Sequence, residues 1–116
     1  MELNEYQKLA LQTAVYPAEY KILYPALGMN GEAGEVADKV KKVIRDTIVL
    51  KDCNGTIVLP KDKSIELAKE VGDVLWYCAT LAKDLGFSLE EIAQMNVDKL
   101  QSRQNRGKLG GSGDNR

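Results

Sequence analysis

The sequence predicts an all-α fold: a bundle of four to five helices with a small β-hairpin inserted at about residues 47–60, assembled as an oligomer. Three observations predict it. Four segments repeat apolar residues with the period of a helix, whereas the period changes to that of strands between about residues 47 and 60. The third helical segment is apolar around most of its circumference, which a lone chain of 116 residues can hardly bury. We therefore expect a dimer or a higher homo-oligomer.

Two helices are predicted before the hairpin. The first covers about residues 4–15 and stops before Pro17, because a proline disfavours helix in the residue that precedes it. The second covers about residues 24–46, with Pro25 in its first turn, where the missing amide is tolerated. One side of this second helix carries the apolar residues Met29, Ala33, Val36, Ala37, Val40, Val43 and Ile44.

The segment between the second and third helices is predicted to be a β-hairpin. The apolar runs at residues 48–50 and 56–59 flank Asp52-Cys53-Asn54-Gly55. The Asn-Gly pair favours a tight turn between two strands. We expect a small hairpin inserted between helices.

The third and fourth helices follow the hairpin. The third is predicted over about residues 64–85, with Ser64 as its N-cap and Gly86 as its stop. Ser88 and Glu91 form a capping box that opens a fourth helix to roughly Gln104. The helical domain is therefore predicted to span residues 1–106. The tail, residues 107–116, is too glycine-rich to pack by itself, and we expect a flexible tail or a lid that orders on a ligand.

The composition excludes several classes of function. The 16 basic and 17 acidic residues nearly cancel, so no overall field attracts nucleic acid or an anionic membrane. No apolar run approaches the roughly 20 residues that span a bilayer, and we expect a cytoplasmic protein. The absence of histidine excludes the usual catalytic triads and His-based zinc sites. Cys53 and Cys78 lack the spacing of metal ligands, and we expect free thiols.

Two pairs of acidic residues are the strongest candidates for chemistry. Glu32 and Glu35 lie three residues apart on the second helix, and Glu70 and Asp73 lie three apart on the third. This spacing places both members of a pair on one helix face, at the edge of the apolar side. If the two helices pack antiparallel, all four carboxylates converge and repel unless a cation neutralises them. Mg²⁺ prefers such oxygen ligands, and Mn²⁺ can substitute.

Each acidic pair also encloses a glycine inside a helix, where glycine costs roughly 1 kcal/mol relative to alanine. We expect close packing, a metal or a phosphate against Gly34 and Gly72 to explain them. The alternative for the acidic pairs is that they are solvated surface acids, paired with Lys39, Lys42 and Lys69 at helical spacing.

The fourth helix carries candidate phosphate donors. Its predicted inward side contains Leu89, Ile92, Ala93 and Leu100, yet Asn96 and Arg103 fall in the same sector and Lys99 lies at its border. Polar groups on an inward side need partners. Asn96, Lys99 and Arg103 therefore form a ladder of donors, extended by Arg106 and Lys108, although basic residues also favour a helix C-terminus for its dipole alone.

Several other polar or aromatic side chains are weaker candidates for substrate contact. Tyr77 follows Asp73 by four residues, so its hydroxyl can reach a carboxylate or a phosphate, although a half-buried structural role explains it equally well. The candidates for contact with a base or a sugar are Gln7, Tyr16, Tyr20, Tyr24 and Trp76, although such residues more often belong to a core or an interface.

With these motifs in place, the sequence resembles the MazG-type all-α nucleoside triphosphate pyrophosphohydrolases. The hallmark of that family is E-x-x-E on one helix and E-x-x-D on the next, here Glu32-x-x-Glu35 and Glu70-x-x-Asp73. The flanking residues 31–36, 70–77 and 99–107 also match, and the resemblance covers roughly residues 4–107. The segment 47–60 departs from the compact family form by lengthening the connection between the two motifs.

The resemblance implies a reaction and an assembly. It implies Mg²⁺ bound by the four acids and hydrolysis of an NTP or dNTP to NMP or dNMP plus pyrophosphate, often for nucleotide pool control or house-cleaning. It also implies homodimers or homotetramers with active sites near subunit contacts. Either Glu32 or Glu35 would take the proton of the attacking water. Substrate phosphates would be held by Tyr77, Asn96, Lys99, Arg103 and Arg106.

Other functions remain open at this stage. One is a non-catalytic helical module that docks a basic partner or binds a structural divalent ion. Another is an enzyme like phosphoribosyl-ATP pyrophosphohydrolase, which cleaves the same bond with similar motifs. The enzyme reading is favoured because the four acids and the basic ladder occur together.

Overall fold

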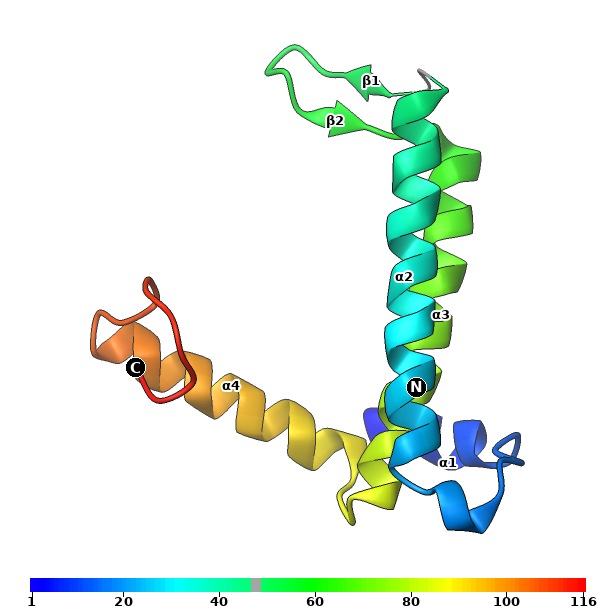
Figure 1. Ribbon diagram of the computed structural model, residues 1–116. Helices are drawn as coiled ribbons and strands as arrows, with labels where there is room; N and C mark the ends of the chain where they lie inside the picture. Colours follow the sequence, from blue (N-terminus) through cyan, green and yellow to red (C-terminus); the bar gives the residue numbers. More distant parts are fainter. Residues whose placement is uncertain (47–48) are drawn as a thin grey trace.

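The computed structural model describes residues 1–46 and 49–116, and its elements are helices apart from one two-stranded hairpin (Figure 1). The predicted all-α class is confirmed. In chain order the elements are α1 (Leu3–Leu11), the short 3₁₀ helix η1 (Ala18–Tyr20), α2 (Leu23–Arg45), β1 (Leu50–Lys51), β2 (Ile57–Val58), α3 (Lys61–Asp84) and α4 (Leu89–Asn105).

Helices α2 and α3 form a long antiparallel pair that carries the hairpin at one end (Figure 1). Val43 is buried on α2, and the Cys78 thiol of α3 lies 3.7 Å from the Met29 sulfur of α2. Both cysteines are free, as predicted. The antiparallel packing places the middle of α2 beside the middle of α3, where the two acidic pairs lie.

The small core lies where α1, α3 and the start of α4 meet. It contains Ala10, Ala79, Ala82 and Leu89, with partly buried apolar side chains around them. The buried Gln7 amide joins the three elements: its nitrogen donates to the Ala79 and Phe87 carbonyls, at 3.1 and 3.2 Å, and its oxygen accepts from the Leu89 amide at 3.0 Å. Because every polar atom of this side chain is used, the suggestion that Gln7 contacts a nucleotide base is wrong for this structure.

Two predicted helix boundaries are wrong. Helix α1 ends at Leu11 and does not reach residue 15, because the Thr13 hydroxyl bonds back to the Ala10 carbonyl at 2.8 Å and accepts from the Trp76 indole at 2.8 Å. Helix α3 begins at Lys61, so Ser64 lies inside its first turn instead of capping it, and its amide donates to the Pro60 carbonyl.

The boundaries of α4 agree with the sequence. The Ser88 hydroxyl accepts from the Glu91 amide at 3.1 Å, and the Glu91 carboxylate accepts from the Ser88 amide at 2.7 Å, which is the predicted capping box. Gly86 ends the preceding helix with φ of 85°, a conformation that other residues rarely adopt. The helix continues to Asn105.

The predicted hairpin is present, with strands of two residues each. Leu50 lies opposite Val58, and the Asp52 carboxylate accepts from the Asn54 and Thr56 amides in the loop. Gly55 closes the loop with φ of 77°, as a glycine that follows a turn in a hairpin commonly does. Residues 47 and 48 of the predicted hairpin segment lie outside the described residues.

The chain is extended and leaves much apolar surface uncovered. Its radius of gyration is 17.5 Å, whereas a compact chain of this length has about 13 Å. Helix α4 projects away from the α2/α3 pair (Figure 1). Its predicted inward side therefore turns outward beyond Ala93: Asn96 is exposed, and Leu100 is 44% exposed. Among the described helices, none has the length and apolar character needed to cross a bilayer.

Candidate active site

Three of the four predicted acidic residues come together between α2 and α3. Glu32 of α2 and Glu70 and Asp73 of α3 each present a carboxylate oxygen, and these oxygens all lie within 4.8 Å of one another. Glu35, one turn further along α2, is exposed and lies outside this group. The antiparallel packing that the sequence required is present, but it gathers three carboxylates and not four. We call Glu32, Glu70 and Asp73 the acidic cluster.

The acidic cluster fits an oxygen-liganded divalent cation. Two ligands on opposite sides of an octahedral Mg²⁺ lie about 4.2 Å apart, since each metal–oxygen bond is about 2.1 Å. Oxygens within 4.8 Å of one another therefore need only small side-chain rotations to share one ion. Glu32 and Glu70 are half-buried and Asp73 is exposed, so the cluster combines fixed donors with an open side for substrate.

A lysine partly neutralises the acidic cluster. The Lys39 ammonium lies 3.4 Å from a Glu70 carboxylate oxygen, across the interface between the two helices. Lys42 pairs instead with Asp38, and Lys41 and Lys42 lower the pKa of Asp38 to about 2. Glu35 contributes weakly to the raised pKa of Lys42, after Asp38. The alternative of paired surface acids is therefore met by Lys39 with Glu70, whereas Lys42 pairs with Asp38. Among the described residues, the acidic cluster has this one lysine for three carboxylates.

Three tyrosines, Tyr16, Tyr24 and Tyr77, have their rings in contact, and we call them the aromatic group. Burial raises the pKa of Tyr77, and Tyr24, Glu32 and Asp73 raise it further. The Tyr77 ring packs against α2 at Gly28, one turn before Glu32. Tyr24 lies 6.4 Å from Tyr77 and stacks on Tyr16 at 5.0 Å between ring centroids. The prediction that Tyr77 shares a side with Asp73 agrees with this arrangement.

The glycine that matters at this site is not one that the sequence singled out. A Cβ on Gly28 would run into the Tyr77 ring, so α2 approaches α3 closely only because residue 28 has no side chain. A Cβ on Gly34 or Gly72 would meet nothing within 4 Å among the described residues. The expectation of close packing at Gly34 and Gly72 is therefore wrong within a single chain.

Asp84 is a functional candidate that no sequence pattern predicted. Asp84, at the end of α3, accepts from the Tyr16 hydroxyl at 2.8 Å and from the Ile22 amide at 2.9 Å. Ile22 has a φ of 69°, which a β-branched residue rarely adopts. These contacts join residues more than 60 positions apart, so no local pattern predicts them. Asp84 fixes the segment that carries the aromatic group.

The predicted phosphate donors lie on α4. Within one chain this helix projects away from the α2/α3 pair (Figure 1), which carries the acidic cluster. Asn96 and Lys99 line a hollow of about 280 Å³ on its surface, together with Ile92 and Met95. Arg103 is buried by the tail, residues 107–116, and not by the bundle. The structure therefore brings Tyr77 to the acidic cluster but does not bring the basic ladder there within a single chain.

Comparisons with known proteins identify the family. A model of the MazG nucleotide pyrophosphohydrolase domain matches residues 24–107, from the start of α2 to just beyond α4. The Gene 37 protein of Mycobacterium phage L5 is 43% identical over 122 aligned positions, which cover 100% of both chains. No solved structure matches the chain. Since the matched region contains both acidic motifs and the helices that carry them, the chain belongs to the MazG nucleotide pyrophosphohydrolase family.

Proposed function

We propose that this protein is a divalent-metal-dependent nucleoside triphosphate pyrophosphohydrolase, which converts an NTP or dNTP to NMP or dNMP plus pyrophosphate. One observation carries the proposal: carboxylates from two helices converge within 4.8 Å in a chain of a nucleotide pyrophosphohydrolase family. Mg²⁺ is the expected cofactor and Mn²⁺ a substitute, because three carboxylate oxygens are hard donors. Nucleotide pool control or house-cleaning is the expected purpose.

The acidic residues divide into two roles. Glu32, Glu70 and Asp73 would hold the ion. When bound, the ion supplies positive charge that stabilises the charged triphosphate and makes water more acidic. Glu35 lies outside the acidic cluster and is exposed, so its carboxylate would stay free of the ion and open to water. Of the two candidate general bases, Glu32 and Glu35, this geometry favours Glu35.

The remaining predicted residues would bind substrate. The Tyr77 side chain lies one turn along α3 from Asp73, and its hydroxyl would donate to a phosphate oxygen. Asn96, Lys99, Arg103 and Arg106 would neutralise the phosphates. Their position on a projecting α4 means that the donors would reach the acidic cluster of a second copy or move toward their own. A homodimer or homotetramer is supported by exposed apolar side chains such as Val71, Leu75 and Met95.

Product analysis tests the proposal. Purified protein is incubated with Mg²⁺ and a panel of NTPs and dNTPs, and the products are separated by anion-exchange chromatography. Monophosphate and pyrophosphate in equal amounts are expected, with neither formed by Glu70→Gln or in excess chelator. Titration calorimetry with Mn²⁺ separates the roles: Glu70→Gln should lose metal affinity, whereas Glu35→Gln should keep it and still lose turnover. Metal binding without turnover on any nucleotide would favour the non-catalytic metal-binding module.

A further inference from the structure

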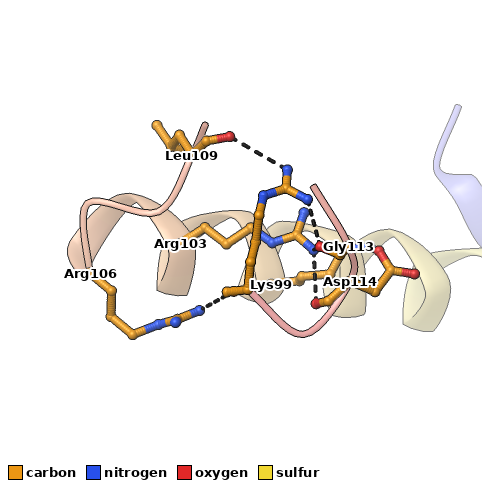
Figure 2. Close-up of polar contacts among 7 residues, drawn as sticks. Lys99, Arg103, Arg106, Leu109, Gly113 and Asp114 are labelled. Atoms are coloured by element: carbon orange, nitrogen blue, oxygen red, sulfur yellow. Dashed lines mark hydrogen bonds and ion pairs between the residues drawn. The ribbon is translucent and has the colours of Figure 1, made fainter. Parts of the chain in front are cut away.

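The C-terminal tail buries an arginine that α4 alone would leave in water. Arg103 is only 5% exposed, although its helix neighbours are exposed from Gln94 to Ser102. Figure 2 shows the Arg103 guanidinium directed at Gly113 and Asp114, where the tail folds back over the end of α4. The burial of Arg103 is therefore produced by the tail.

The tail surrounds the basic side chains with oxygen atoms. One Arg103 nitrogen donates to the Gly113 carbonyl at 3.2 Å and the Asp114 carbonyl at 2.9 Å, and the Asp114 carboxylate lies at 3.4 Å. The Lys99 ammonium lies 3.4 Å from the same carboxylate oxygen. Arg106 donates to the Arg116 main-chain oxygen at 2.9 Å. Three predicted phosphate donors are thus already held by acceptors of this chain (Figure 2).

The tail satisfies this site incompletely. Among the described residues the buried Arg103 Nε atom has no hydrogen-bond partner, and the hydrogen bonds of this guanidinium go through its Nη2 atom. Guanidinium groups bind phosphates best in pairs of parallel bonds from two nitrogens. The Asp114 side chain is 86% exposed, so its carboxylate sits at the rim of the site and can leave without opening a core. A ligand with several oxygen atoms could accept from the Arg103 Nε atom as well as from Nη2.

Glycine sets the path of the tail. Gly107, Gly111 and Gly113 have φ of 65°, 87° and 87°, values that residues with a side chain rarely adopt. Gly110 does not have a positive φ, and a Cβ there would meet nothing within 4 Å among the described residues. The conformation in which the tail covers Arg103 therefore requires the three glycines with positive φ. Gly110, which does not have one, serves as a control.

We propose that the tail is a displaceable cover over a diphosphate-binding site formed by Lys99 and Arg103, with Asp114 as the competing anion. A diphosphate group would replace the Asp114 carboxylate and use the free Arg103 Nε. The inference deepens the proposed function, because the diphosphate belongs either to the triphosphate substrate or to free pyrophosphate. The tail would then hold the phosphate donors inactive until substrate displaces it.

Metal-free calorimetry with inorganic pyrophosphate tests the competition in the full chain. Asp114→Asn should bind pyrophosphate about two- to fivefold more tightly than the parent, the range expected for losing an exposed ion pair. Asp98→Asn is the matched control, since it removes an exposed negative charge next to Lys99 that bonds Gln94 and not the tail, and it should change affinity less. Arg103→Gln should abolish binding.

A second pair of variants acts on the tail without changing charge. Gly113→Val should displace the tail and tighten pyrophosphate binding on the order of tenfold, because valine resists a positive φ. Gly110→Val should leave the affinity unchanged. In ¹⁵N spectra, pyrophosphate should shift the amide signals of Gly111, Gly113 and Asp114 toward those of a mobile chain.

Two results would overturn the inference. One is equal affinity in the parent, Asp114→Asn and Gly113→Val. The other is no pyrophosphate binding by any protein that retains Arg103. Because these titrations use no metal and no turnover, failure of the proposed hydrolysis would not affect them. A nonhydrolysable nucleoside triphosphate titrated in excess pyrophosphate separates the two sources: lost binding assigns the site to the substrate, and undisturbed binding assigns it to free pyrophosphate.

Discussion

The acidic cluster and the basic end of α4 carry opposite charges and are built in opposite ways. The acidic cluster joins two long helices, and Lys39 forms an ion pair with Glu70 across their interface. The basic end, which comprises Lys99, Arg103 and Arg106, lies on one projecting helix. Its partners come from the glycine-rich tail, residues 107–116. Carboxylates held by helix packing suit a metal that needs fixed ligands, whereas cations covered by a tail suit a ligand that arrives and leaves.

The largest expected effect is at the acidic cluster. Glu70→Gln removes a charged ligand and should lower turnover by at least about 10²-fold, since even outer-shell changes at metal sites cost about 10–100-fold. Glu66→Gln, one turn earlier on α3 and paired with Lys63 instead, is the control and should keep most activity. Steady-state rates at saturating Mg²⁺ measure both. Equal activity of the two variants would remove the acidic cluster from the mechanism.

The next largest effect concerns Gln7, which connects α3 to the start of α4. Gln7→Leu removes the side-chain hydrogen bonds to the Ala79 and Phe87 carbonyls and from the Leu89 amide. We expect a loss of about 3 kcal/mol in unfolding free energy, roughly 1 kcal/mol for each lost bond. Urea denaturation measures it, and Gln12→Leu, at an exposed position of the same segment, provides the comparison. A loss below that of Gln12→Leu would contradict the role of Gln7.

Glycine substitutions sharpen the comparison at the acidic cluster itself. Gly28→Ala should destabilise the protein by about 2 kcal/mol, because the new methyl group overlaps the Tyr77 ring. Gly34→Ala, in open space on the same helix, should instead stabilise by up to about 1 kcal/mol. Thermal unfolding of both variants checks the signs. Destabilisation by Gly34→Ala would indicate that a second copy or a ligand approaches that glycine.

The smallest effect is a pH dependence beside the aromatic group. Burial, first, and the Asp84 hydrogen bond raise the pKa of Tyr16 from 10.0 to about 12. The raised value means that the unfolded chain loses the Tyr16 proton before the folded chain does, so this stabilisation is complete below pH 10 and fades as the pH rises toward 12. Tyr16→Phe should cost about 1 kcal/mol at pH 8. The difference between the two proteins in urea titrations should shrink above pH 10, and a constant difference would argue against this hydrogen bond.

Much of the fold followed from local patterns. The helix periodicity, the Ser88 capping box, the Gly86 stop and the hairpin turn each depend on residues a few positions apart, and all are confirmed. The errors at Val15 and Ser64 arose where local signals were overridden. Trp76 holds the Thr13 hydroxyl from α3, and the chain enters α3 from Pro60 without any side-chain cap.

The candidate site divides along the same line. The spacing within the pairs Glu32/Glu35 and Glu70/Asp73 predicted a site shared by four acids, because residues three apart lie on one helix face. The structure brings three of the four together. The exclusion of Glu35 from the acidic cluster depends on the rotation of α2 against α3, which spacing does not set. The basic ladder was predicted from residue type and helical position, but the burial of Arg103 by the tail was not.

By itself, the sequence determined the helical class, the family motifs and the chemistry available to the site, since periodicity, capping and residue type act over short distances. Only the tertiary structure decided that Gly28 and not Gly34 is the close contact, that Asp84 anchors the aromatic group, and that Asp114 covers Arg103. Each of these contacts depends on how segments that are distant in the sequence pack against one another. Such long-range packing produces no periodicity or residue spacing that the sequence alone could reveal.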